Sequence, residues 1–315
     1  MHDIPVNATV LTPMTALLAH HPVDPSELWS AWHPDPAIVA ALAFAAVLYH
    51  HGLVRVRISR VRAPVAFAGG MLALVVALAS PLDAAAASIF SAHMVQHLVL
   101  VIVAAPLLVC GRPGLVFTAA LPARPRRAVR RLGSRPGVRR VAKALSQPIV
   151  AWALAAVTLW AWHHPALYEA AVDHDVVHAV EHATLLGTAA VVWAVALGRV
   201  RRPVPVPAAA LLLFATALQG GALGAVLTLA RAPLYTVHTA MAPRWGLTPL
   251  EDQQLAGALM WMPPGLVYVG VIAALFVRWF GALEAAPGVA AEAVTGRSAG
   301  ATSGGIATPA GRRPS

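Results

Sequence analysis

The amino-acid sequence predicts an all-α fold: a polytopic membrane protein built as a seven-transmembrane helix bundle, with its N-terminus outside and its C-terminus cytoplasmic. Three observations lead to this prediction: the composition, seven long apolar segments and a one-sided distribution of basic residues. Of the 315 residues, 58% are hydrophobic and only 11% are charged, whereas a soluble domain has about 25% charged residues. The mean hydropathy of +0.69 is typical of a membrane protein.

Each apolar segment has close to the roughly 20 residues that a helix needs to cross about 30 Å of hydrocarbon. None shows the strict alternation of polar and apolar residues that a barrel strand would need. The segments therefore predict seven membrane-spanning helices. The predicted spans are residues 37–53, 64–81, 88–110, 148–165, 176–197, 207–230 and 255–279.

Lysine and arginine lie almost entirely on one side of this predicted bundle. Of the 23 basic residues, only Arg231 and Arg244 fall on the other side. The positive-inside rule then places the basic side in the cytoplasm. The net charge of +10 is explained by topology and contact with anionic lipid, so a nucleic-acid partner is not expected. The cytoplasmic basic residues are Arg55, Arg57, Arg60 and Arg62, nine arginines and Lys143 within 111–147, Arg199, Arg201 and Arg202, and Arg278, Arg297, Arg312 and Arg313.

The chain divides into three predicted regions. Residues 1–36 form an extracytoplasmic N-terminal tail that has no lysine or arginine, so it is interpreted as a translocated tail rather than a cleaved signal peptide. Residues 37–280 form the seven-span transmembrane domain. Residues 281–315, rich in alanine, glycine, serine, threonine and proline, form a disordered cytoplasmic tail. The Arg- and Pro-rich loop 111–147 is predicted to lie along the inner headgroups.

Histidines gather at the outer ends of the third, fourth and fifth spans. His93 and His97 are four residues apart, so they share one face of a helix. His174, His178 and His182 repeat this spacing, with Glu181 beside them, and His163 and His164 end the fourth span on the same side. Ionisable groups at this depth are costly to place in lipid and usually serve a function. The pattern predicts a metal or cofactor site.

A single histidine at a helix end is more often a structural anchor, but so many on one side favour a functional site. Their spacing is compatible with copper, zinc or haem iron. The chain has one cysteine, which excludes a site built from several thiolates. His50 and His51 lie at the opposite end of the first span and are interpreted as interfacial anchors.

Four motifs resemble, in order, those of the CtaG family of cytochrome c oxidase assembly factors, and the resemblance covers about residues 35–280. They are His-Met-Val-Gln-His-Leu at 93–98 with Ala-Pro-Leu-Leu at 105–108 and Gly-Arg-Pro at 111–113, Trp-His-His-Pro-Ala-Leu-Tyr at 162–168, His-Ala-Val-Glu-His at 178–182, and the last-helix stretch 245–257. An unrelated single-span copper chaperone of the same name works through cysteines that this chain lacks.

The resemblance implies a seven-span protein of the cell membrane that supports maturation of haem-copper oxidases through copper delivery, with cytochrome c oxidase subunits as partners. The metal site would lie on the extracytoplasmic side. The residues that match the family's site are His93, His97, His163, His178, Glu181 and His182.

Two other functions compete with a copper-binding assembly factor. The alternative is a membrane-bound b-type cytochrome with bis-histidine haem ligation, and a transporter is the third possibility. The inner halves of the spans are apolar, which disfavours a transporter. The sequence contains no nucleophile–base pair, phosphate-binding loop or carboxylate dyad, so we expect no catalytic residues and no enzymatic turnover.

The predicted topology can be tested by fusing reporters after Arg297. A reporter that works only in the cytoplasm should be active there, and one that works only after export should be silent. Activity of the exported reporter would reverse the orientation and move the histidines to the inner side.

Overall fold

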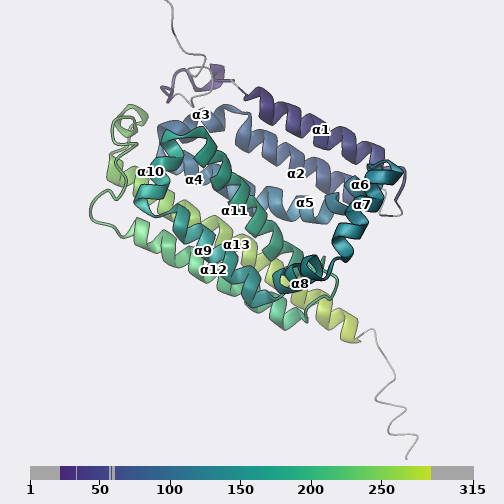
Figure 1. Ribbon diagram of the computed structural model, residues 1–315. Helices are drawn as coiled ribbons and strands as arrows, with labels where there is room; N and C mark the ends of the chain where they lie inside the picture. Colours follow the sequence, from purple (N-terminus) through teal and green to yellow (C-terminus); the bar gives the residue numbers. More distant parts are fainter. Residues whose placement is uncertain (1–21, 33, 57, 59–60, 285–315) are drawn as a thin grey trace, which may run out of the picture. The chain divides into compact units, whose positions relative to one another are not determined.

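The computed structural model describes residues 22–284 except 33, 57 and 59–60, and all regular secondary structure within these residues is helical (Figure 1). The chain forms two units, Met1–Ile272 and Ala273–Ser315. The described part of the second unit is the end of the last helix, where Phe276, Trp279 and Phe280 pack ring against ring. Most of the predicted N-terminal tail, including His2, His20, His21 and His33, lies outside the described residues, as does the predicted disordered segment from 285 onward.

A helix lies in each of the seven predicted spans. Within the described residues, five helices are long and apolar enough to cross a membrane, or up to seven if each of two bent helix pairs is one span. An all-helical fold with five to seven candidate membrane spans is therefore confirmed within these residues, while the count of seven and the orientation stay predictions. The helices are α1 (Pro36–Leu53), α2 (Arg62–Leu78) bent into α3 (Pro81–Ser88), α4 (Phe90–Leu98) continued through the π-helical turn η3 (Val99–Ala104) into α5 (Ala105–Gly111), α9 (Pro148–Trp162), α11 (Asp175–Ala196), α12 (Val206–Thr228) and α13 (Pro249–Glu284).

The segment predicted as a loop over 111–147 is helical instead. It forms α6 (Pro113–Ala120), α7 (Ala123–Ser134) and α8 (Pro136–Leu145). Proline stands at the start of α6 and α8, where its missing N–H costs nothing and its fixed φ favours a helix. Alanine, leucine and arginine, all good helix formers, fill much of the rest. A further short helix, α10 (Pro165–Asp173), follows α9 at the end where the histidines gather.

Helices α12 and α13 approach each other closely at two glycines. A Cβ atom added to Gly224 would lie 2.8 Å from the carbonyl oxygen of Gly257, and one added to Gly257 would lie 2.6 Å from Oγ1 of Thr228. Both distances are shorter than side-chain carbons tolerate, so only glycine permits this contact. The adjacent core joins α4, α10, α12 and α13. Its buried members are Phe90, Met94, Tyr168, Leu223, Leu227, Tyr235, Ala256 and Met260.

The N-terminus of α4 is capped by a residue from another helix. Its own N-cap position is Ile89, whose side chain cannot accept a hydrogen bond. Asp252 of α13 accepts hydrogen bonds from the backbone N–H groups of Phe90 at 2.8 Å and Ser91 at 2.9 Å. The buried carboxylate thus satisfies donors that a helix end leaves open and lies at the positive end of the helix dipole. Helix α4 is held in place by α13 as a result.

Helix α13 begins with a capping box formed by Thr248 and Glu251. The Glu251 carboxylate accepts from the backbone N–H and the hydroxyl of Thr248, and the Glu251 N–H donates to Thr248 Oγ1 at 3.2 Å. Glu251 is exposed, and its carboxylate complements the N-terminus of the helix. The next residue, Asp252, is instead buried against α4.

Replacing Asp252 should destabilise the protein more than replacing its exposed neighbour. Asp252→Ala leaves two N–H groups without their acceptor, at a cost of about 2 kcal/mol of unfolding free energy. Glu251→Ala removes a solvent-exposed cap and serves as the matched control. The measurement is thermal unfolding of both variants in detergent. Equal losses of thermal stability would contradict the capping role of Asp252.

Candidate metal centre

Helices α4 and α11 each present one pair of histidines to the other. His93 and His97 of α4 face His178 and His182 of α11, and the ring centroids are 5.3 Å apart both between His93 and His178 and between His97 and His182. All four rings are buried. Each pair has the spacing of four residues that places side chains one above the other on a helix. Five of the six predicted metal ligands, these four histidines and Glu181, are brought together.

Glu181 lies between the two histidines of α4. Its Oε2 is 3.7 Å from His93 Nε2, and its Oε1 is 3.6 Å from His97 Nε2. Both distances are too long for hydrogen bonds. Within the described part of the chain, neither carboxylate oxygen of Glu181 and neither ring nitrogen of His97 has a hydrogen-bond partner. Since the Glu181 side chain is fully buried, such a carboxylate is costly unless a cation or donor compensates it.

The donor atoms form two overlapping groups of three, and each group is close enough to share one cation. One ligand atom each from His93, His97 and His182 lie within 4.8 Å of one another, as do atoms from His93, His178 and Glu181. A metal ion with bonds of about 2.0–2.1 Å to nitrogen separates its ligand atoms by up to about 4 Å. Small side-chain rotations are therefore enough to close the shell. The residues fit a metal ion on these distances and on the open polar atoms of Glu181 and His97.

The sixth predicted ligand, His163, lies beside this cluster but outside both groups of close donor atoms. It follows the last residue of α9, and its ring centroid is 6.4 Å from that of His97. Its Nδ1 is 2.7 Å from the Leu159 carbonyl oxygen, and its Nε2 is 3.4 Å from the sulfur of Met94. His163 and Met94 therefore form an imidazole–thioether pair next to the cluster.

The neighbouring histidines His164 and His174 do not join the site. Both are exposed, and His174 is the N-cap residue of α11. His174 shares the four-residue spacing with His178 and His182, but the chain leaves helical geometry at this point. The four-residue spacing in the sequence therefore includes one histidine, His174, that lies outside the site.

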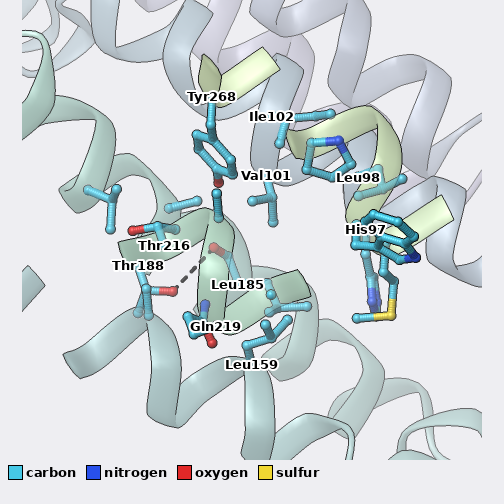
Figure 2. A pocket seen from close by; sticks show the side chains of 18 of the residues that line it. His97, Leu98, Val101, Ile102, Leu159, Leu185, Thr188, Thr216, Gln219 and Tyr268 are labelled. Atoms are coloured by element: carbon cyan, nitrogen blue, oxygen red, sulfur yellow. Dashed lines mark hydrogen bonds between the residues drawn. The ribbon is translucent and has the colours of Figure 1, made fainter. Parts of the chain in front are cut away.

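An apolar cavity adjoins the cluster inside the helix bundle. It has a volume of about 90 Å³, and Met94, His97 and His163 line one part of it. Figure 2 shows His97 at one side, and Thr216, Gln219 and Tyr268 toward the other. Most of the lining is aliphatic or aromatic, so the cluster borders a space of low polarity. Such surroundings strengthen the attraction between Glu181 and any cation held by the histidines.

A hydrogen-bonded chain that includes His238 supports the cluster from the segment between α12 and α13. The Tyr168 hydroxyl is 2.7 Å from His238 Nε2, and His238 also hydrogen-bonds to the backbone of Ser88. Because the other ring nitrogen must donate to the Ser88 carbonyl, Nε2 accepts the Tyr168 proton. The Tyr168 ring packs against His93, with centroids 5.1 Å apart.

The hydrogen bonds that link Tyr168, His238 and Ser88 were not predicted from the sequence. His238 has no partner at helical spacing, and it lies in no apolar segment that would draw attention to it. Tyr168 belongs to the 162–168 motif, and that motif is the signal that points to it. From the same segment as His238, Tyr235 donates a hydrogen bond of 2.8 Å from its hydroxyl to the His163 carbonyl.

His238 predicts a loss of stability in mild acid. Burial lowers the pKa of His238 from 6.5 to about 4, with a smaller contribution from His93. The unfolded chain takes up the proton below about pH 6.5 and the native state does not, so unfolding free energy falls between pH 6.5 and 4. His238→Gln keeps a donor and an acceptor but does not titrate. Thermal unfolding in detergent should show that wild type loses roughly 2 kcal/mol more than the variant on going from pH 7.5 to 5. Equal losses would contradict a neutral buried His238.

Comparison with known proteins gives one family. The model of the cytochrome c oxidase caa3 assembly factor family (Caa3_CtaG) matches residues 47–282, well over half of the chain. The match includes all four motifs and every residue of the cluster. Among curated proteins and among solved structures, none matches this chain. The family match confirms the resemblance, and the chain belongs to the cytochrome c oxidase caa3 assembly factors.

Proposed function

We propose that this assembly factor binds one copper ion between α4 and α11 and supports its insertion into a cytochrome c oxidase subunit. The ligands would come from His93, His97, His178, His182 and Glu181. The single observation that carries the proposal is the pair of facing histidine pairs with a buried carboxylate between them. An ion there would satisfy Glu181 and His97 together.

One donor beside the cluster, the thioether of Met94, favours copper over zinc. A structural zinc site usually takes four ligands in a closed tetrahedral set and often includes thiolates. Here the donors are imidazoles and a carboxylate, and the thioether of Met94 lies beside His163 at the edge of the cluster. Copper(I) accepts both imidazole and thioether ligands. His163 and Met94 would thus extend the site toward a second position for the same ion.

The spacing of the rings does not favour the haem alternative. Two axial histidines hold a haem from opposite sides, with the whole macrocycle between them. The rings that face each other across the two helices are only 5.3 Å apart, and Glu181 lies between the two helices at the same place. A single ion fits this arrangement, and a porphyrin would have to separate the helices.

The position of the cluster suits transfer to a partner protein. His178 lies in the first turn of α11, and His163 follows the last residue of α9, so the ligands are near helix ends. An ion bound here is within reach of one membrane surface, which the positive-inside rule makes the extracytoplasmic side. The role we propose is that of a carrier at the cell membrane, without turnover of its own.

The copper proposal predicts that removing two ligands from one helix empties the site. His178→Ala with His182→Ala should lose most of about one copper per chain, because too few donors remain. His50→Ala with His51→Ala is the matched control, since both residues are exposed at the far end of α1. Copper is measured anaerobically on purified, folded protein. Unchanged copper in the first variant would refute the assignment, and a Soret band in wild type would favour haem.

The copper proposal also predicts a change in the copper content of the oxidase in cells. His93→Ala with His97→Ala should lower oxidase copper as strongly as deletion of the gene, with this protein still present at normal level. Truncation after about residue 285 should have little effect, because that segment has neither ligands nor apolar bulk. Equal oxidase copper in the histidine variant and the truncation would mean that these histidines only pack the bundle.

A further inference from the structure

Helices α7 and α8 repeat one amphipathic pattern. In α7, Pro125, Ala128, Val129 and Leu132 follow the spacing i, i+3, i+4 and i+7, and in α8 the same spacing is taken by Val138, Val141, Ala142 and Leu145. These positions lie within about 100° of one helix face. The arginines and Lys143 occupy the opposite face. Each helix thus has one apolar and one cationic side, as helices do that lie in a membrane interface.

The apolar side of these helices is left uncovered by the rest of the described chain. Leu132 is 51% exposed and Val141 is 60% exposed. Helix α8 meets α9 at an angle of 78°. Because α9 lies in a predicted span, α8 runs across the direction of that span, and we interpret it as a helix that lies along the membrane plane. Lipid is the partner that fits an apolar face in this position.

A basic hollow lies between α8 and the segment that follows α11. Its volume is about 930 Å³. Five cationic side chains line it, from two separate parts of the chain, and no acidic residue is among the described residues around it. Val138 and Val204 contribute apolar wall. The five cations are Arg139, Arg140, Lys143, Arg201 and Arg202.

The hollow and the histidine cluster lie at opposite ends of the same helices. Helix α9 begins just after α8 and ends at His163, and α11 carries His178 near its start and is followed by Arg201. The hollow is therefore separated from the candidate metal centre by about the length of one predicted span.

We propose that this hollow binds the headgroup of a phospholipid that carries two phosphates, with its acyl chains along the apolar face of α8. Guanidinium groups match phosphate oxygens in charge and in paired geometry. Four arginines and a lysine suit two phosphates better than one. Basic pockets beside membrane helices bind such headgroups. The uncovered valines distinguish this site from one for free phosphate or nucleic acid, because neither ligand has acyl chains that could pack against them.

The test uses the full chain, purified in a neutral detergent and titrated with diphosphatidylglycerol, phosphatidylglycerol, phosphatidylcholine or inorganic phosphate. Binding is followed by native mass spectrometry. We expect wild type to bind diphosphatidylglycerol at least tenfold more tightly than the other three. Arg139→Gln, Arg140→Gln, Arg201→Gln and Arg202→Gln together should weaken this binding by roughly tenfold or more, since each basic residue near an anionic surface contributes appreciably.

The matched control is Arg124→Gln, Arg126→Gln, Arg127→Gln and Arg130→Gln, which removes the same charge from α7. Seven of these eight arginines are exposed and Arg126 is partly exposed, so both variants should fold. Retained binding in the control and loss in the first variant supports the hollow. Equal loss in both would show general attraction to a basic surface and would overturn the proposal. So would equally tight binding of inorganic phosphate, or of a nucleic acid duplex in a parallel titration.

Discussion

The structure of this protein depends on one costly arrangement, a buried carboxylate held between imidazoles inside a membrane bundle. Glu181 has no hydrogen-bond partner among the described residues, and its two oxygens lie 3.6 and 3.7 Å from His97 and His93. In lipid, such a group destabilises the fold unless a positive charge accompanies it. Copper between α4 and α11 would remove that cost. Binding and folding of this part of the bundle would then be coupled.

The surrounding contacts keep α4 where the site needs it. Asp252 caps its first turn from α13, and Gln96 donates hydrogen bonds to the Ala77 carbonyl at 2.8 Å and to Asp83 at 2.7 Å. Three other elements, α13, α2 and α3, therefore fix the helix that carries His93 and His97. The π-helical turn begins two residues after His97. Turns of this kind often occur beside functional sites.

The two ends of the bundle have different chemistry. One end gathers imidazoles and carboxylates with little basic charge, and the other gathers arginines on α7, α8 and the segment after α11. This division suits a protein that holds a cation at one surface and rests on anionic lipid at the other. The same helices, α9 and α11, connect the two ends.

The amino-acid sequence by itself determined the membrane class, the approximate spans, the pairing of His93 with His97 and of His178 with His182, and the family. These features depend on local hydrophobicity and on the helical repeat, which need no knowledge of distant contacts. The tertiary structure decided which faces meet. It placed His163 beside the cluster and left His174 exposed. It also buried Asp252 against α4 and connected His238 to the cluster through Tyr168. It also turned the loop over 111–147 into helices. Such outcomes depend on packing between residues up to 162 positions apart, and no local pattern encodes which distant partner a buried polar group will find.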